Sequence, residues 1–238
     1  RDIKIKYRRS VLGVLWTLLN PLCMMIILSI VFSSIFKFDV ENFPLYVLSG
    51  QVIFNFFNDS TTSSMSAIIS SASLIKKVYV PKYLFVLSRV MSSFINLMAS
   101  FTALLLVMVA TRAELHWTVF LSVIPLAMVV LFSFGVGMFL AAITVRFRDV
   151  IHLYSVFTTG LLYLTPVIYP MAALPDVVKT IVMINPLTNY LLMFRDVMFN
   201  NTLPSVFSVL LGIAEAALAL ALGLYVFYKN QDEFILNL

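Results

Sequence analysis

Long apolar stretches follow one another along almost the whole chain, with only short polar connections between them. A helix that crosses a bilayer needs about 20 mostly apolar residues. Hydrophobic residues make up 61% of the 238 residues and charged residues 11%, whereas soluble domains average roughly 45–50% and 25%. We therefore expect an all-α membrane protein that folds as a single domain over 1–238. Its six transmembrane helices are predicted at about 14–36, 45–72, 85–110, 119–145, 151–168 and 206–228.

Lysines and arginines divide unevenly between the two sides that six spans define. Twelve of the sixteen fall on the side of both termini and of the connection at 73–83. Because basic connections stay in the cytoplasm, we expect both termini inside a bacterial cytoplasmic (inner) membrane and the region 166–204 outside. The basic residues follow membrane sides, so no nucleic acid is expected as a partner. The chain opens on Arg1 without an initiator Met, and we expect further residues upstream.

The first ten residues, RDIKIKYRRS, alternate apolar and basic side chains directly before the first span. Lysines and arginines in such a segment reach lipid phosphates, so we predict an amphipathic interface helix in the headgroup region. The residues expected to form its polar and interfacial contacts are Lys4, Lys6, Tyr7, Arg8 and Arg9. In the span that follows, Pro21 is expected to kink the helix, because its ring removes one backbone donor.

The connection SLIKKVYVPKY, residues 73–83, is compact and basic. Its apolar residues are interleaved with lysines, so it can form a short amphipathic helix along the bilayer surface. Two interpretations stay open for this connection. It either offers one face to a soluble partner, or it is an ordinary basic loop that only fixes the topology.

Polar side chains recur in steps of three or four along the second predicted span. The set is Asn55, Asn58, Asp59, Thr62, Ser66, Ser70 and Ser73. Such spacing places them on one face of a helix. At membrane depth, polar groups face protein or a wet cavity and not lipid. The stripe therefore predicts either a cavity lining or a face of small residues that packs against neighbouring helices.

Prolines divide the region 166–204 into pieces too short to span. Irregular backbone at membrane depth must be buried in protein or line water. We predict two short re-entrant or interfacial helices that meet at Asn185 and Pro186, and an extracellular amphipathic loop is the alternative. A second tight connection, RFRDV, holds Arg146, Arg148 and Asp149, and Arg146 and Asp149 are expected to pair and brace the turn.

The chain has no GxxxxGK[ST] motif, so it cannot hydrolyse ATP unaided. HExxH and GxSxG motifs are also missing, and one cysteine, Cys23, supplies neither a disulfide framework nor a metal site. The two histidines, His116 and His152, are interpreted as interfacial or packing residues. We therefore expect no enzyme activity, no metal and no cofactor in this chain. Asp59 and Glu215 could form a proton relay, but the internal repeat common in secondary transporters is not visible.

Several ordered motifs resemble the ABC-2 type permeases that export polysaccharides and polyol phosphates, including O-antigen and teichoic-acid exporters. They are RDIKIKYRRSVLGVLWTLLNP, LSGQVIFNFFNDS, SLIKKVYVPKY, RFRDV, TPVIYP and INPL, and they cover nearly the whole chain. The resemblance implies a homodimer of six-span subunits, each bound to one separate nucleotide-binding subunit that holds ATP and Mg. It also implies an outer gate at Pro166, Pro170, Asn185 and Pro186, and a cytoplasmic coupling helix at the ATPase interface formed by Leu74, Ile75, Lys76, Lys77, Val78, Tyr79, Val80, Pro81 and Lys82.

The function expected from this resemblance is that of a permease subunit of an ATP-driven exporter. Its cargo would be a lipid-linked cell-surface polysaccharide such as O-antigen or teichoic acid. Flat aromatic faces suit sliding sugar rings, and the residues expected on the translocation path are Trp16, Phe54, Asn55, Phe57, Asn58, Asp59, Tyr163 and Tyr169. The alternatives are an ABC-2 exporter of drugs or small lipids, a membrane-embedded enzyme that uses Asp59 or Glu215 on lipid-linked sugars, and a passive channel.

Overall fold

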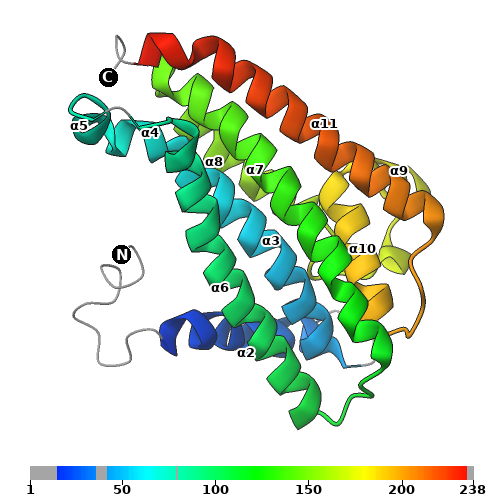
Figure 1. The fold of residues 1–238 in the computed structure, drawn as a ribbon. Coiled ribbons are helices and arrows are strands. Elements are labelled where there is room, and N and C mark those ends of the chain that lie inside the picture. Colours follow the sequence, from blue (N-terminus) through cyan, green and yellow to red (C-terminus); the bar gives the residue numbers. More distant parts are fainter. Residues whose placement is uncertain (1–14, 36–41, 79, 235–238) are drawn as a thin grey trace.

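The computed structural model describes residues 15–35, 42–78 and 80–234, and in these ranges every regular element is a helix (Figure 1). The predicted all-α class is confirmed. The predicted interface helix, with Lys4, Lys6, Tyr7, Arg8 and Arg9, lies outside the described residues, as does Tyr79.

Four long helices run side by side through the molecule, and shorter helices join or cross them (Figure 1). The long ones are α3 (Phe43–Met65), α6 (Tyr83–Ala110), α7 (Val123–Arg146) and α11 (Val206–Asn230). The others are α2 (Trp16–Ile35), α4 (Ala67–Ser70), α5 (Ala72–Ile75), α8 (Val150–Tyr163), α9 (Asp176–Ile184) and α10 (Pro186–Met198), with 3₁₀ turns η2 (Trp117–Ser122), η3 (Met171–Ala173) and η4 (Gln231–Glu233).

Three helical segments of the described chain are long and apolar enough to cross a membrane: Tyr83–Ala110, Trp117–Arg146 and Val206–Glu233. They match the predicted third, fourth and sixth spans. Helix α3 has 23 residues, but its polar stripe makes it less apolar than these. Helix α8 has 14 residues, about 21 Å at ~1.5 Å per residue, against a hydrocarbon core of ~30 Å. The fifth span, predicted to reach 168, is thus shorter, because the chain leaves the helix at Leu164, ahead of Pro166.

Helix α2, predicted as the first span, crosses α6 and the beginning of α3 instead of running along them (Figure 1). Pro21 lies inside α2, one turn after its start. Met25 of α2 joins the buried cluster that α3 and α6 share. The full six-span arrangement therefore stays a prediction. The described residues contain three helices that could cross a membrane, or four if the bent pair α9 and α10 counts as one span.

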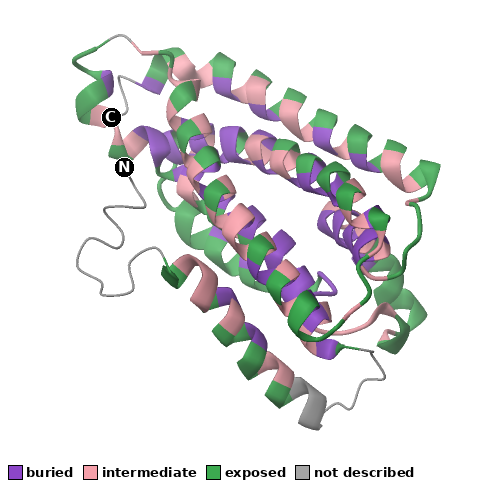
Figure 2. Cartoon of the chain, turned by 60° about the horizontal axis from the view of Figure 1, so that its bottom comes forward, coloured by how far each residue is buried: buried purple, intermediate pink, exposed green. Residues whose placement is uncertain are grey.

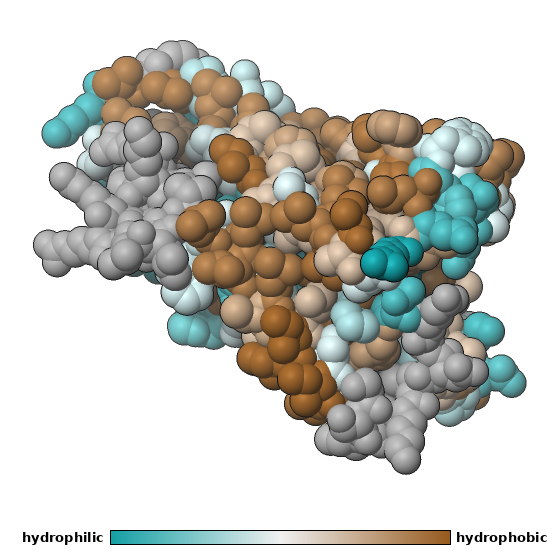
Figure 3. Space-filling view, turned by 90° about the horizontal axis from the view of Figure 1, so that it is seen from below, coloured by the Kyte–Doolittle hydropathy of each residue, from teal (hydrophilic) through white to brown (hydrophobic). Residues whose placement is uncertain are grey.

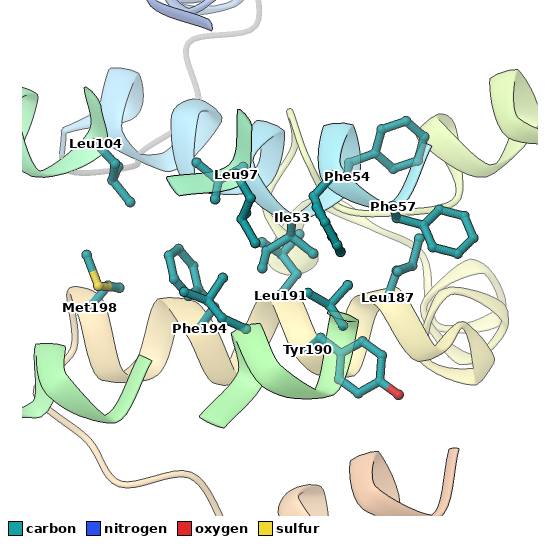
Figure 4. Close-up of a cluster of buried hydrophobic side chains, with 14 of the residues drawn as sticks. Ile53, Phe54, Phe57, Leu97, Leu104, Leu187, Tyr190, Leu191, Phe194 and Met198 are labelled. Carbon is teal, nitrogen blue, oxygen red and sulfur yellow. The ribbon is translucent and has the colours of Figure 1, made fainter. Parts of the chain in front are cut away.

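The helix pair α9 and α10 bends by 95° at its junction, which falls at Asn185 and Pro186 as the prolines predicted. Most of α10 is buried (Figure 2). Its side chains interdigitate with those of α3 and α6, so this short helix is a central part of the core (Figure 4). The core residues labelled there are Ile53, Phe54, Phe57, Leu97, Leu104, Leu187, Tyr190, Leu191, Phe194 and Met198.

Helices α7 and α11 approach each other at two glycines. A Cβ built on Gly135 would collide with the backbone of Ala219 and Leu220, and one on Gly223 would collide with the carbonyl of Gly135. A Cβ on Gly137 would lie 2.7 Å from Oγ of Ser64 on α3. Small residues allow such contact between helix backbones in membranes. Gly135 and Gly137 therefore allow α7 to pack closely against α11 and α3.

Much of the outer surface is apolar. Residues on the outward sides of α8 and α11 are exposed, with Val156 72% and Phe207 74% accessible. Seen from below, wide areas of apolar side chains cover the middle of the molecule, and hydrophilic residues lie toward its edges, most of them on the right (Figure 3). Soluble monomers rarely expose apolar patches of more than a few hundred Å², so this surface fits a lipid environment.

Candidate functional site

The polar stripe predicted on the second span lies on the surface of the subunit. Asn55, Asp59, Thr62 and Ser66 are exposed on or directly after α3, and Asn58 is half-buried beside them. The opposite side of α3 is packed into the core. Because polar groups are costly against lipid, this face needs water, cargo or another protein surface in front of it.

The stripe is shorter than predicted. Helix α3 ends at Met65, so Ser70 and Ser73 are exposed on separate short helices and do not continue the same face. Serine hydroxyls bond to nearby backbone carbonyls around the break. Ser66 Oγ donates to the carbonyl of Ser63 at 3.2 Å, and Ser70 Oγ donates to that of Ala67 at 3.3 Å.

The aromatic residues predicted for the path separate into two groups. Phe54 and Phe57 are only 5% and 3% exposed and belong to the core, where Phe57 stacks on Phe132 with ring centroids 5.8 Å apart. They face away from the stripe, because the large apolar side chains of α3 pack into the core. Trp16 and Tyr163 are exposed. Tyr169 is half-buried and donates from its hydroxyl to the carbonyl of Tyr163 at 2.6 Å.

Helix α8 is fixed beside the stripe by a buried hydrogen bond. The hydroxyl of Tyr154 donates to Oγ1 of Thr61 on α3 at 2.8 Å. The burial of Tyr154 contrasts with the exposure of its α8 neighbours His152, Leu153 and Val156. The stripe of α3 and the outward side of α8 therefore form one continuous surface of mixed polarity.

A buried arginine holds the predicted gate region together. Arg195 of α10 is 5% exposed. Its Nη1 donates to the carbonyl of Pro166 at 2.8 Å, and its Nη2 donates to those of Tyr46 at 3.0 Å and Val167 at 3.1 Å. Its Nε donates to Oγ of Ser49 at 3.1 Å. The guanidinium also lies over the ring of Tyr46, 3.5 Å from the centroid.

These bonds tie three segments that are far apart in sequence: the start of α3, the irregular chain after α8, and α10. Asn185 adds a second tie, because its Nδ2 donates to Oγ1 of Thr165 at 2.8 Å while its Oδ1 accepts from the backbone N–H of Leu187 and caps α10. Pro186 occupies the first turn of α10, where a proline removes no hydrogen bond. We call Arg195, with the carbonyls and hydroxyl that it binds, the arginine latch.

Sequence reasoning missed the latch. The charge pattern places Arg195 only among the basic residues outside the cytoplasmic set, although it stands in the apolar run NYLLMFRDVMF. A charge inside an apolar run at membrane depth is expensive and points to a dedicated set of partners. That signal could have identified the residue, but not its partners, because Ser49 and Pro166 lie 146 and 29 residues away.

The basic connection forms an elbow at one end of the bundle, close to the described end of the chain (Figure 1). Leu74, Lys76, Lys77, Val78 and Pro81 are exposed, Val80 and Lys82 are half-buried, and Ile75 is buried. We call residues 72–82 the elbow.

The helix in the elbow is shorter than predicted. Helix α5 covers only Ala72–Ile75, and the lysines lie in the turn after it. Pro81 accounts for part of this, because a proline disfavours helical backbone in the residue before it. The exposed part of this segment is therefore mainly a turn.

The C-terminal segment braces the elbow. Lys82 Nζ donates to the carbonyl of Gln231 and lies 5.7 Å from the ring centroid of Phe234. Phe234 is 1% exposed and packs edge-on against Phe227, with centroids 5.2 Å apart. Both rings join a buried cluster with Ile75 of the elbow. The position of the elbow thus depends on residues 227–234.

The second predicted cytoplasmic turn is exposed throughout, at Arg146, Arg148 and Asp149. Within the described residues, Arg146 and Asp149 make no salt bridge; the guanidinium of Arg146 instead lies 5.6 Å from the ring centroid of Phe147. The predicted pair does not form because helix α7 ends at Arg146, and Asp149 stands just before the start of α8.

The two predicted membrane carboxylates lie on different helices. Glu215 of α11 is half-buried and accepts from Nδ2 of Asn189 at 3.4 Å, whereas Asp59 lies in the stripe of α3. No group of three or more His, Cys, Asp or Glu in the described part of the chain could hold a metal ion.

Comparison with known proteins places these features in a family. The family model described as "ABC-2 type transporter" matches residues 1–199. The chain is 27% identical over 236 residues to the O-antigen export system permease protein RfbA of Klebsiella pneumoniae, covering 98% of this chain and 90% of that protein. The corresponding protein of Myxococcus xanthus is 28% identical, with 98% and 91% covered. The polysialic acid transport protein KpsM of Escherichia coli is 21% identical over 199 residues, with 82% and 77% covered. These matches agree with the motifs that the sequence presents in order, and the chain belongs to the ABC-2 type transporter family.

Proposed function

We propose that this protein is the permease subunit of an ATP-driven exporter of a cell-surface polysaccharide such as O-antigen. The observation that carries the proposal is an exposed polar stripe on a chain that aligns, over 98% of its length, with O-antigen export permeases. The chain has no phosphate-binding loop. ATP and Mg are therefore bound by a separate ATPase subunit.

The stripe of α3 lines the translocation path. A second copy of the chain faces it, so that two stripes enclose a wet channel between the subunits of a homodimer. This arrangement gives Asn55, Asp59 and Thr62 the aqueous surroundings that polar groups need at membrane depth. Exposed Tyr163 and Trp16 are the aromatic residues best placed to contact sugar rings, since Phe54 and Phe57 are taken up by the core.

The elbow is the docking site of the ATPase, with two ATPase copies for each homodimer. Its exposed residues combine apolar side chains, Leu74 and Val78, with the charges of Lys76 and Lys77, as a surface that binds an acidic partner groove would. The elbow, together with the short helix α4, joins α3 to α6. Movement of the ATPase therefore acts directly on the helix that carries the stripe.

The membrane orientation follows from the basic residues. The elbow and both termini face the cytoplasm, and the latch lies on the outer side of the bacterial inner membrane, where it sets the position of the gate residues Pro166, Pro170, Asn185 and Pro186. The polysaccharide is presented on a lipid carrier, since the hydrophobic carrier can enter from the bilayer beside α8.

Export by inverted membrane vesicles that contain the permease and its ATPase tests the proposal. Thr62→Trp places a large side chain in the path and should stop polymer transfer while ATPase co-purification is retained. Thr102→Trp is the matched control, because Thr102 is an exposed threonine of α6 that does not belong to the stripe. Equal export by the two variants would remove the stripe from the path. Transfer of drugs or short lipids, and not of polymer, would favour the alternative exporter class.

A further inference from the structure

A cavity of about 770 Å³ opens at the far end of the bundle, opposite the elbow. Ligand sites typically measure about 300–1,000 Å³. Its walls come from four separate segments: the start of α3, the turn after α6, the chain at Pro170 and Met171, and the last turns of α10. The stripe residues are not among its lining, so the cavity is separate from the proposed path.

The floor and the rim of the cavity differ in character. Arg195 and Leu45 are buried at the floor, while Asn42, Arg112 and Asn200 are exposed at the rim. In the described chain, the hydrogen bonds of Arg195 all go to neutral oxygens, so no carboxylate neutralises it there. The floor therefore presents a fixed positive charge beneath a polar opening.

Two carboxylates, Glu114 and Asp196, also line the cavity. Glu114 contacts Nε2 of His116 at 3.4 Å, and Asp196 accepts from Nδ2 of Asn200 at 3.0 Å. The formal charges of Arg112, Arg195, Glu114 and Asp196 cancel. A phosphate would meet the carboxylates and an ammonium group would meet the arginines, so neither class of charged ligand is favoured.

Hydroxyl groups fit this lining, because each one both donates and accepts a hydrogen bond. The amides and the exposed guanidinium of Arg112 supply donors, and the carboxylates supply acceptors. Leu45, Leu192 and Phe199 add apolar wall that suits the C–H faces of a sugar ring. An uncharged, hydroxyl-rich ring is thus the ligand class that uses every part of the cavity.

The backbone at the rim is also unusual. Three non-glycine residues of the described chain have positive φ, and two of them, Asn42 and Arg112, both at 55°, line this cavity. Left-handed backbone is uncommon for an arginine and clusters at functional sites. The chain thus makes a sharp turn at Asn42 and another at Arg112, and both turns lie at the rim of the cavity.

We propose that this cavity is a saccharide-binding subsite that holds a short run of sugar residues of the polymer after it leaves the path. The inference rests on the proposed function, because it takes the exported polymer as the ligand. Binding there contacts α10 beside the latch and retains the emerging chain on the outer side.

Photo-crosslinking in cells that export the polymer tests this subsite in the intact complex. The photoreactive residue p-benzoylphenylalanine replaces Phe199, which lines the cavity, and Phe207 serves as the matched control, because it is exposed on the first turn of α11 and does not line it. A third position, Asn55, reports on the stripe. After irradiation the permease is purified and stained for attached polymer.

We expect a ladder of polymer-bearing species at positions 199 and 55 and none at 207. Asp196→Ala should lower the yield at position 199 about tenfold, as expected for loss of one hydrogen bond to a charged group, with ATPase co-purification unchanged as the folding control. A ladder at 55 with none above the 207 background at 199 would overturn the subsite and leave the proposed function standing. Ladders at neither position during active export would overturn both, and crosslinks to phospholipid alone at 199 would overturn the subsite.

Discussion

Replacing Arg195 with methionine removes the arginine latch while keeping a side chain of similar length. Four oxygens then lose their donor: those of Tyr46, Ser49, Pro166 and Val167. A hydrogen bond from a charged donor contributes about 1.5–3 kcal/mol, so the gross loss is several kcal/mol. Removing a buried charge recovers part of this, because its desolvation cost also disappears. We expect a net destabilisation of about 3–5 kcal/mol, the size associated with breaking a buried network.

The effect should be local before it is global. Amide hydrogen exchange of residues 164–170 and of the first turns of α3 should accelerate in Arg195→Met, since their mutual tie is the latch. Exchange in α7 and α11, which pack through their own glycines, should stay unchanged until global unfolding. Arg195→Lys keeps the charge but lacks the planar guanidinium that reaches several acceptors. Its exchange rate at 164–170 should therefore lie between those of the unmodified chain and of Arg195→Met. Exchange at 164–170 equal to that of the unmodified chain would refute the latch.

Three further predictions concern the elbow, its brace and the helix packing. Lys76→Glu with Lys77→Glu should abolish co-purification of the ATPase, whereas Lys179→Glu, at an exposed lysine of α9, should not. Equal binding by both would exclude the elbow as the docking site. Phe234→Ala leaves a cavity at a buried site, so it should lower the free energy of unfolding by about 3–5 kcal/mol and reduce ATPase stimulation. Phe207→Ala, at an exposed site, should change neither. Thermal unfolding and the rate of ATP hydrolysis measure the two effects. Gly135→Ala forces α7 from α11 and should cost about 1–3 kcal/mol, whereas Gly160→Ala, with no atom within 4 Å of the added Cβ, should be neutral or stabilising; equal melting temperatures would contradict the packing.

Local patterns predicted the elements well and their partners poorly. The run of apolar residues from Tyr83 to Ala110 predicts a long helix because its length alone decides the outcome. Pro186 predicts a break at Asn185 because a proline disfavours helical backbone in the residue before it. Both depend on neighbouring residues only, so the sequence carries them fully.

Tertiary contacts decide what the sequence left open. Phe54 and Phe57 are aromatic residues in a span beside polar neighbours, and only the placement of α10 shows that they face the core. The partners of Arg195 come from three distant segments, and no periodicity encodes such a meeting. The contact of Phe234 with Phe227 was missed for the same reason. The C-terminal residues KNQDEF are mostly polar, and their sequence does not indicate that the Phe234 ring is buried.

Movement of polymer by purified components tests the transport mechanism most directly. The permease is reconstituted into vesicles with and without its ATPase, and transfer of polymer across the bilayer is measured with ATP, without ATP, and with Lys76→Glu and Lys77→Glu in the elbow. We predict transfer only when ATP, the ATPase and an intact elbow are all present. Transfer by the permease alone, with no nucleotide-hydrolysing subunit, would contradict the proposal that this chain forms the membrane path and that a separate ATPase subunit drives transport.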